Sequence, residues 1–313
     1  MINISNSNSI SNSKSNNTQL SISFKEDFDN KFYISKIGFK KDLESNNYFN
    51  ATIQCLINIK VLCDEIVVVS YEKIKNNLLK NLHDLIIALT NNNIEEVNEN
   101  LTKLNVSLLN MNPVFRNKDS HDSKILLKYI LEECDKENLI KDNIKIEFSK
   151  NCSCEEIKTN IIEFDIKNII KFNNNRILTI DDCFNYYLKC QKCKKKVNIT
   201  KLPPVLIIFI NYGDKNAEIE NSYKFDEIIN LKTLNEEYKE YFLSSIIACK
   251  NIGTYFELFY TFSRLDEHSN YTMYNGSEVR YDIKVKNKLE KQKIDLKDRK
   301  QSWPWVLIYC EKN

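Results

Sequence analysis

The apolar pattern of the sequence changes its period near residue 140, and this change constrains the fold more than any other feature. Before that point apolar side chains recur every three or four residues, as at Phe49, Ile53, Leu56 and Ile57, which is the spacing of one helix face. Beyond it they gather in short runs rich in β-branched residues, such as Val205 to Ile210, which are typical of buried strands. The sequence therefore predicts an α+β chain with a helical first half and a mainly β second half.

The same patterns locate the individual elements. Helices are expected from residue 49, over much of residues 71–110, and around Ile125, Leu126, Tyr129 and Ile130. Strands are expected at residues 144–148, 205–210, 242–248, 256–262 and 306–309. Asn46 or Asn47 is a suitable cap for the first helix, because a short amide side chain can accept a bond from a free backbone N–H at a helix start.

The first 22 residues differ in kind from the rest. They are a Ser/Asn-rich repeat with very few apolar side chains, so they cannot bury enough surface to offset the entropy of ordering. We expect residues 1–22 to be a disordered tail and residues 23–313 to form one folded domain, a length that supports a substantial core.

Charge and hydropathy exclude two classes of partner. The chain has 45 Lys and Arg against 43 Asp and Glu, so no overall field favours direct binding to nucleic acid. No apolar run approaches the ~18 residues of a membrane span, and the polar N-terminus lacks a secretory core, so we expect no membrane association. An intracellular location, in cytoplasm or nucleus, is expected.

Four cysteines are spaced as a metal site. Cys152 and Cys154 form one close pair, and Cys190 and Cys193 form a second with the C-x2-C spacing of a zinc knuckle. Four thiolates match the tetrahedral preference of structural zinc, and on an extended strand Cys152 and Cys154 share one face. We expect a structural Zn²⁺ bound by the four; the alternative is that they are ordinary reduced thiols.

The remaining cysteines lie in apolar surroundings and are expected to be buried, inert thiols. They are Cys55, Cys63, Cys134, Cys183, Cys249 and Cys310. Ten cysteines in an intracellular chain favour metal ligands and buried thiols over a disulfide framework.

The segment from Asn46 to Leu56 reads N-N-Y-F-N-A-T-I-Q-C-L. It resembles the nucleophile box of the ubiquitin-specific proteases, N-T-C-Y-M-N-S-x-L-Q-x-L, with Asn47 in the cysteine position. Segment 257–264, E-L-F-Y-T-F-S-R, resembles the G-H-Y-T-A-Y-V-R box of that family, with Leu258 in the histidine position. In both segments the surrounding residues resemble the family pattern, whereas the reactive side chain is replaced.

Further segments resemble motifs of the same family in the same order, at residues 122–131, 178–187, 201–210, 241–247, 271–276 and 304–309. The best preserved is K-L-P-P-V-L-I-I-F-I at 201–210, which is similar to the family's L-P-x-V-L-I-I-H-L strand. Each match is weak alone, but together they span most of residues 38–309. The resemblance implies a papain-like fold with a helical thumb, a β-rich palm and zinc-binding fingers at about residues 144–215.

The resemblance also implies a chemistry that these residues do not supply. In active members a thiolate at a helix N-terminus, paired with histidine, attacks the C-terminal carbonyl of ubiquitin. Here Asn47 cannot ionise and Leu258 cannot accept a proton, whereas Asn275 keeps the third, orienting position. Asp42 lies near the position of an oxyanion-stabilising Asn, where a carboxylate would repel the developing charge.

Three functions follow as hypotheses. The first is a pseudoprotease that binds ubiquitin, a ubiquitinated protein or a larger complex without hydrolysis. The second is an active deubiquitinase with a displaced nucleophile, for which Cys55 is the nearest thiol. The third is a purely structural, zinc-containing scaffold subunit that has lost ubiquitin binding.

Overall fold

A computed structural model describes residues 37–39, 47–69, 71–116, 122–140, 142–150, 158–172, 178–190, 193–212, 225–252, 256–263, 271–275, 278–283 and 302–312. The chain divides into two compact units, Met1–Phe32 and Tyr33–Asn313. The expected tail at 1–22 lies outside the described residues, so everything below concerns the second unit.

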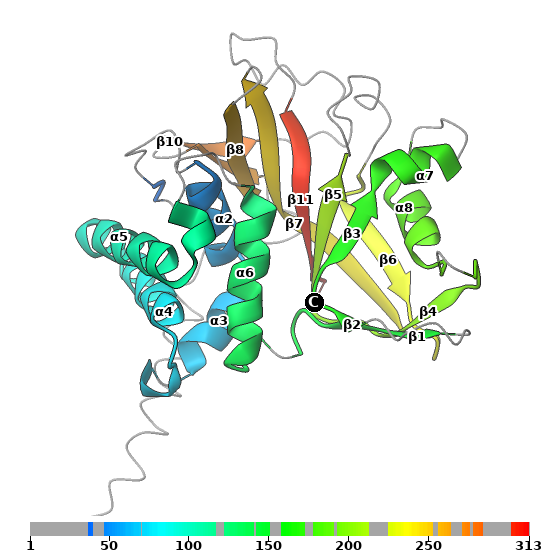
Figure 1. Ribbon diagram of the computed structural model, residues 1–313, viewed down its shortest axis with the longest axis horizontal. Helices are drawn as coiled ribbons and strands as arrows, with labels where there is room; N and C mark the ends of the chain where they lie inside the picture. Colours follow the sequence, from blue (N-terminus) through cyan, green and yellow to red (C-terminus); the bar gives the residue numbers. More distant parts are fainter. Residues whose placement is uncertain are drawn as a thin grey trace, which may run out of the picture. The chain divides into compact units, whose positions relative to one another are not determined.

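The helical half is built as the apolar period predicts (Figure 1). Its helices are α2 (Asn47–Ile57), α3 (Lys60–Val68), α4 (Asn77–Thr90), α5 (Ile94–Met111) and α6 (Ser123–Lys136), with short 3-10 turns η2 (Tyr71–Lys73) and η3 (Pro113–Arg116). Polar side chains begin three of them: Asn76, Asn93 and Asp122 accept bonds from the first backbone N–H groups of α4, α5 and α6.

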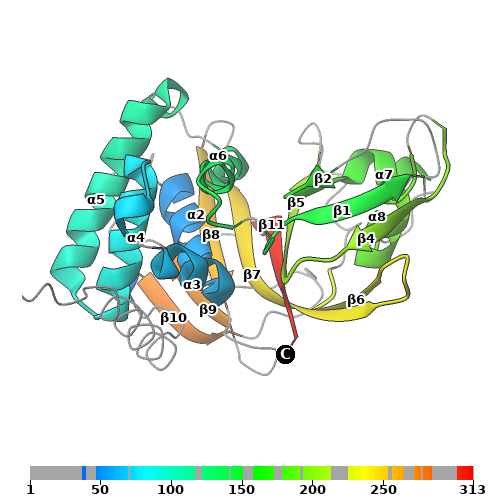
Figure 2. The same ribbon diagram turned by 90° about the horizontal axis from the view of Figure 1, so that it is seen from below.

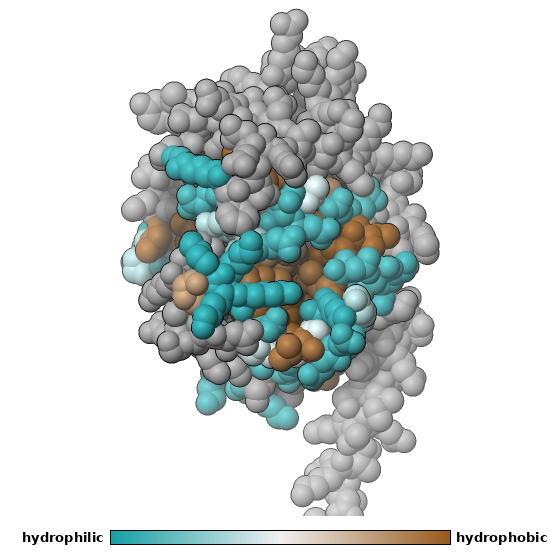
Figure 3. All heavy atoms as spheres, turned by 90° about the vertical axis from the view of Figure 1, so that its right-hand side faces the viewer, coloured by the Kyte–Doolittle hydropathy of each residue, from teal (hydrophilic) through white to brown (hydrophobic). Residues whose placement is uncertain are grey.

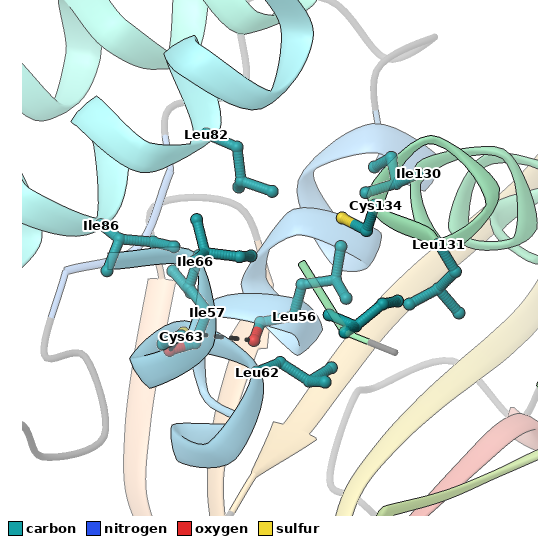
Figure 4. A pocket seen from close by; sticks show the side chains of 11 residues that line it. Leu56, Ile57, Leu62, Cys63, Ile66, Leu82, Ile86, Ile130, Leu131 and Cys134 are labelled. Atoms are coloured by element: carbon teal, nitrogen blue, oxygen red, sulfur yellow. Dashed lines mark hydrogen bonds between the residues drawn. The ribbon is translucent and has the colours of Figure 1, made fainter. Parts of the chain in front are cut away.

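The helices enclose a hydrophobic core of their own. Side chains from α2, α3, α4 and α6 converge on a cavity of about 10 Å³ (Figure 4), lined by Leu56, Ile57, Leu62, Cys63, Ile66, Leu82, Ile86, Ile130, Leu131, Cys134 and Ile140. The Cys63 thiol lies 3.4 Å from the carbonyl oxygen of Ile57, to which it donates. So tight a fit accounts for the inert behaviour expected of Cys63 and Cys134.

The second half forms two sheets. The smaller contains β1 (Ile146–Lys150), β2 (Lys158–Thr159) and β4 (Val197–Lys201), in the order β2-β1-β4. The larger has the order β10-β9-β8-β7-β11-β5-β3, with β6 also paired to β7. Its strands are β3 (Ile162–Asp165), β5 (Val205–Asn211), β6 (Ile228–Lys232), β7 (Tyr238–Ile252), β8 (Phe256–Ser263), β9 (Tyr271–Asn275), β10 (Glu278–Ile283) and β11 (Ser302–Glu311).

Two pairings in the larger sheet join segments far apart in the sequence. Strand β11 lies between β7 and β5 and pairs antiparallel with both. Strand β3 pairs parallel with β5, with Ile162 opposite Ile208. Because both faces of β5 are covered, the strand is a continuous apolar run from Val205 to Ile210, as its sequence predicts.

The sheets and two further helices share one core. Helices α7 (Ile166–Phe172) and α8 (Ile180–Tyr187) pack through Ile169 and Phe184 onto the strands, and Figure 2 shows them beside β4 and β1. A capping box between Thr179 and Asp182 begins α8. Cys183 is fully buried in this core, as expected.

The outer surface of this end of the molecule is mainly hydrophilic. Figure 3 views it from the right-hand side of Figure 1, where hydrophobic side chains show between long polar ones among the described residues. Within the described part of the chain, every helix is too short or too polar to cross a lipid bilayer.

Candidate functional site

The candidate site lies where the first helix meets the large sheet. Asn47 is the first residue of α2 and is 6% exposed. A pocket of about 10 Å³ opens beside it. We call this the Asn47 pocket; it is lined by Phe39, Asn47, Asn50, Ala51, Gln54, Phe259 and Tyr274.

The pocket joins the segments that carry the other candidate residues. Phe259 in β8 and Tyr274 in β9 line it, and they are the chain neighbours of Leu258 and Asn275. Leu258 pairs with Lys250 of β7 in the backbone ladder. The fold thus brings the three segments together, although the side chains of Leu258 and Asn275 and the whole of Asp42 lie outside the described residues.

Helix α2 is held against the sheet at this point by a buried bond. Thr261 of β8 donates its hydroxyl to the carbonyl oxygen of Ala51, 2.7 Å away. Asn47, Asn50 and Ala51 at the start of α2 line the pocket, so the partial positive charge of the helix N-terminus would stabilise an anion there. Asn47 offers a neutral amide in that place, which cannot ionise.

Gln54 is the unusual polar residue of the pocket. Its side chain is 2% exposed, and among the described residues neither its amide nitrogen nor its amide oxygen has a hydrogen-bond partner. Most buried polar atoms in proteins are paired, so such an exception marks a bound water, a ligand or a functional role. It lies two helical turns along α2 from Asn47, on the face that lines the pocket.

A buried lysine connects α6 to the sheet next to the pocket. Lys124 is 8% exposed and donates from Nζ to the carbonyl oxygen of Ile210 at 3.1 Å and to Asn211 Oδ1 at 2.8 Å. The same ammonium lies 3.7 Å from the ring centroid of Trp305, and Trp305 Nε1 donates to Asp122 Oδ1. We call these contacts the Lys124 bridge.

The sequence model of the ubiquitin carboxyl-terminal hydrolase family matches residues 40–309. The chain belongs to this family. No curated protein matches the sequence. The helices packed on a mixed sheet are thus the papain-like fold of the ubiquitin-specific hydrolases, which confirms the expected family and fold class.

Solved structures agree with this assignment of the hydrolase fold. A chain of the SAGA DUB module Ubp8/Sgf11/Sus1/Sgf73 bound to monoubiquitin is similar, with a TM-score of 0.65 and 14% identity, covering 97% of this chain and 77% of that one. The same module bound to ubiquitin aldehyde gives a TM-score of 0.62 at 14% identity, with the same coverage. At this identity the likeness shows the fold alone.

Cys55, the thiol considered as a displaced nucleophile in this hydrolase fold, is completely buried. Burial raises its pKa well above the usual value, and a hydrogen bond with Ser245 only partly opposes this effect. A protonated thiol is a poor nucleophile. Cys55 is also absent from the lining of the Asn47 pocket. Its thiol is therefore not placed to attack the carbonyl of a substrate held in that pocket.

The expected zinc ligands are described only in part. Cys193 is exposed and Cys190 is partly buried, whereas Cys152 and Cys154 lie outside the described residues. Bonds from Cys190 N to Lys195 O (2.9 Å) and from Lys194 N to Cys190 O (2.7 Å) close a tight turn. Lys194 has a φ of 61°, so the backbone folds back as a cysteine knuckle requires.

The strand that precedes the other cysteine pair ends near the strand that follows this turn. In the antiparallel pair β1 and β4, Lys150 lies opposite Val197, and Cys152 follows Lys150 by two residues. Four thiolates are the donor set that structural zinc prefers. Among the described residues no group of three or more metal ligands converges, and with half the expected set outside them, zinc binding stays a prediction.

Sequence reasoning missed Gln54 and Lys124. Gln54 matches the nucleophile-box pattern, and no other feature of the sequence sets it apart. At α6 the apolar pattern groups Ile125 with Leu126, but Ile125 is 52% exposed and Lys124 is buried in its place. In the sequence Lys124 is simply the residue after Ser123. A local pattern carries no information on a partner such as Ile210, which is 86 residues away in the chain.

Proposed function

We propose that the chain binds ubiquitin or a ubiquitinated protein without hydrolysing it. The observation that carries the proposal is the position of Asn47: it begins the helix that faces the pocket in which the family places its nucleophile. A carboxamide cannot supply a thiolate, and leucine at position 258 cannot act as a base. In comparable triads, loss of these roles leaves only the residual acceleration that the oxyanion hole and substrate binding supply.

A ubiquitin titration tests the proposal. We expect saturable binding of ubiquitin or diubiquitin to residues 24–313, measured by calorimetry or NMR shifts, and no covalent adduct with a ubiquitin probe carrying a C-terminal electrophile. A covalent adduct would favour the displaced-nucleophile hypothesis. Loss of the adduct in a Cys55→Ala variant would identify Cys55 as the nucleophile. Absence of binding at millimolar ubiquitin would favour the structural scaffold.

We also propose protein partners beyond ubiquitin. The SAGA DUB module is a multi-subunit assembly, and a similar fold without catalysis is suited to a place in a larger complex in the cytoplasm or nucleus. Co-purification of the full chain under native conditions, followed by mass spectrometry, would identify such subunits.

We also propose a structural Zn²⁺ held by Cys152, Cys154, Cys190 and Cys193. The tight turn at Cys190 and the pairing of β1 with β4 support it. With all four positions filled, the ion would stabilise the fingers and leave no site for a reactive water.

A further inference from the structure

The turn at Cys190 carries an excess of positive charge that the total charge of the chain does not reveal. The sequence from residue 189 to residue 196 is K-C-Q-K-C-K-K-K, with five lysines in eight residues. From residue 183 to residue 213 the chain contains no Asp or Glu. We call residues 188–197 the basic hairpin. The near balance of charges over the whole chain averages out this local excess.

The backbone of the basic hairpin places two of its lysines side by side. Cys190 N donates to Lys195 O at 2.9 Å, and Lys189 and Lys196 form an antiparallel bridge. Opposite residues of an antiparallel pair project from the same face, with Cβ atoms about 5 Å apart, and like charges in such a pair are destabilising. The fold itself therefore gains no stability from the pairing of Lys189 with Lys196.

The lysines of the basic hairpin are open to solvent. Lys194, Lys195 and Lys196 are exposed and Lys189 is partly exposed, whereas Lys192 lies outside the described residues. Within the part of the chain that the structure describes, neither Lys195 nor Lys196 forms an ion pair. Their ammonium groups are thus available to an anionic partner.

An excess of positive charge remains even with the proposed zinc ion in place. Four thiolates around one Zn²⁺ leave two negative charges in excess, which offset only two of the five lysines. The segment that carries the other two cysteines adds no net charge, because Lys150 and Lys158 balance Glu155 and Glu156. The basic hairpin is therefore more than a counterion for the metal site.

The chemistry of the basic hairpin fits a phosphate backbone better than a folded protein. Lysine is a compact point charge that binds phosphate without a fixed geometry, whereas protein interfaces are enriched in aromatic side chains and depleted in lysine. Among the described residues of 178–200, no large apolar side chain is exposed. This surface thus lacks both the apolar centre of a protein interface and the exposed rings on which single-stranded bases stack.

We propose that the basic hairpin binds the phosphate backbone of double-stranded DNA without reading its sequence. A duplex presents one negative charge per about 1.7 Å of its axis, and each lysine that neutralises a phosphate releases a condensed counterion. The hairpin and the Asn47 pocket are formed by different elements. Binding of DNA therefore does not depend on whether the chain binds ubiquitin.

The salt dependence of DNA binding tests the proposal. A fluorescently labelled duplex of about 20 base pairs is titrated with the full chain at about 50 and 200 mM salt, and binding is measured by anisotropy. The logarithm of the affinity falls with the logarithm of the salt concentration by about 0.9 per phosphate contact. With four lysines in contact, we expect the affinity to fall about 150-fold between the two salt concentrations.

Two double variants, each of which removes two positive charges, locate the contact. Lys195→Gln with Lys196→Gln should weaken binding at the lower salt concentration and reduce the salt effect to about tenfold. Lys103→Gln with Lys128→Gln removes the same charge from exposed positions on α5 and α6 and should keep the wild-type salt effect. Arginine at positions 195 and 196 preserves the charge and should preserve binding.

Three outcomes would overturn the proposal. The first is the absence of saturable duplex binding by the wild-type chain at the lower salt concentration. The second is an equal salt effect in the two glutamine variants, because the charge would then act from no particular site. The third is tighter binding of a polyglutamate peptide than of the duplex, lost in the Lys195→Gln, Lys196→Gln variant, which would assign the basic hairpin to an acidic protein segment.

Discussion

Gln54 carries a buried amide whose two polar atoms have no partner within the part of the chain that the structure describes. Leaving a buried donor or acceptor unpaired costs about 1–3 kcal/mol, whereas replacing it with an apolar group of similar shape can be neutral or stabilising. We therefore expect Gln54→Met to keep or raise the free energy of unfolding, by up to about 1 kcal/mol, in urea denaturation.

Thr52 is the matched control on the same helix. Its hydroxyl is equally buried but is paired, donating to Tyr48 O at 2.7 Å. Thr52→Val should lower the free energy of unfolding by about 1 kcal/mol. If Gln54→Met is instead the more damaging change, the amide is bonded in solution, for example to one water in the Asn47 pocket.

At the scale of elements, a substitution in the turn at Cys190 can distinguish a zinc site from ordinary thiols. Cys193 is exposed, and substitutions on the exposed surface usually change stability by less than about 0.5 kcal/mol. A zinc ligand behaves differently, because structural zinc contributes on the order of 10 kcal/mol to folding. We expect Cys193→Ser to lose bound zinc, measured by elemental analysis, and to unfold at much lower urea concentration.

A chelator supplies the control for this prediction. It should destabilise the wild-type protein strongly and the Cys193→Ser variant hardly at all. A wild-type protein with less than about one equivalent of zinc, and with no response to chelator, would show the four cysteines to be simple thiols.

The elements themselves were largely predictable, because period and capping are local properties. Helices α4, α5 and α6 and strands β5, β7, β8 and β11 appear where the sequence places them. The parallel pairing of β3 with β5 was not foreseen, since no local pattern specifies a partner strand. The Lys124 bridge could not be predicted for the same reason, because Asp122 and Trp305 are 183 residues apart in the sequence.

The candidate site was predictable only through the family pattern. The order of motifs indicated that Asn47, Leu258 and Asn275 belong together, and the fold places their segments around one pocket. Which side chains close that pocket depends on packing between distant segments. Phe39 and Tyr274 could not be assigned to it from the sequence.

At the scale of the whole molecule, buried thiols make stability depend on alkaline pH. Burial raises the pKa of Cys134 to about 12 and that of Cys310 to about 11, from a usual value of 9.0. Because the folded state keeps protons that the unfolded state releases, this contribution is complete below pH 9 and is lost as the pH rises toward the folded pKa. We expect the free energy of unfolding to fall steeply between pH 9 and 11.

Cys310→Ala isolates one of these groups. For a shift from 9.0 to about 11, the wild-type protein should lose roughly 2–3 kcal/mol over that range on account of this thiol alone. The variant should show a shallower slope, compared with its own value at pH 7. An unchanged slope in urea titrations would mean that the Cys310 thiol ionises normally in the folded protein.

The place of β11 has a consequence for biosynthesis. This strand is the last that the structure describes, yet it lies inside the large sheet, between β7 and β5. Until translation has passed Glu311, those two strands present apolar edges with unpaired backbone groups, which are sites of aggregation. The nascent chain thus carries these open edges until β11 has been made, and we expect a stop codon before residue 302 to produce an aggregating polypeptide instead of a shortened domain.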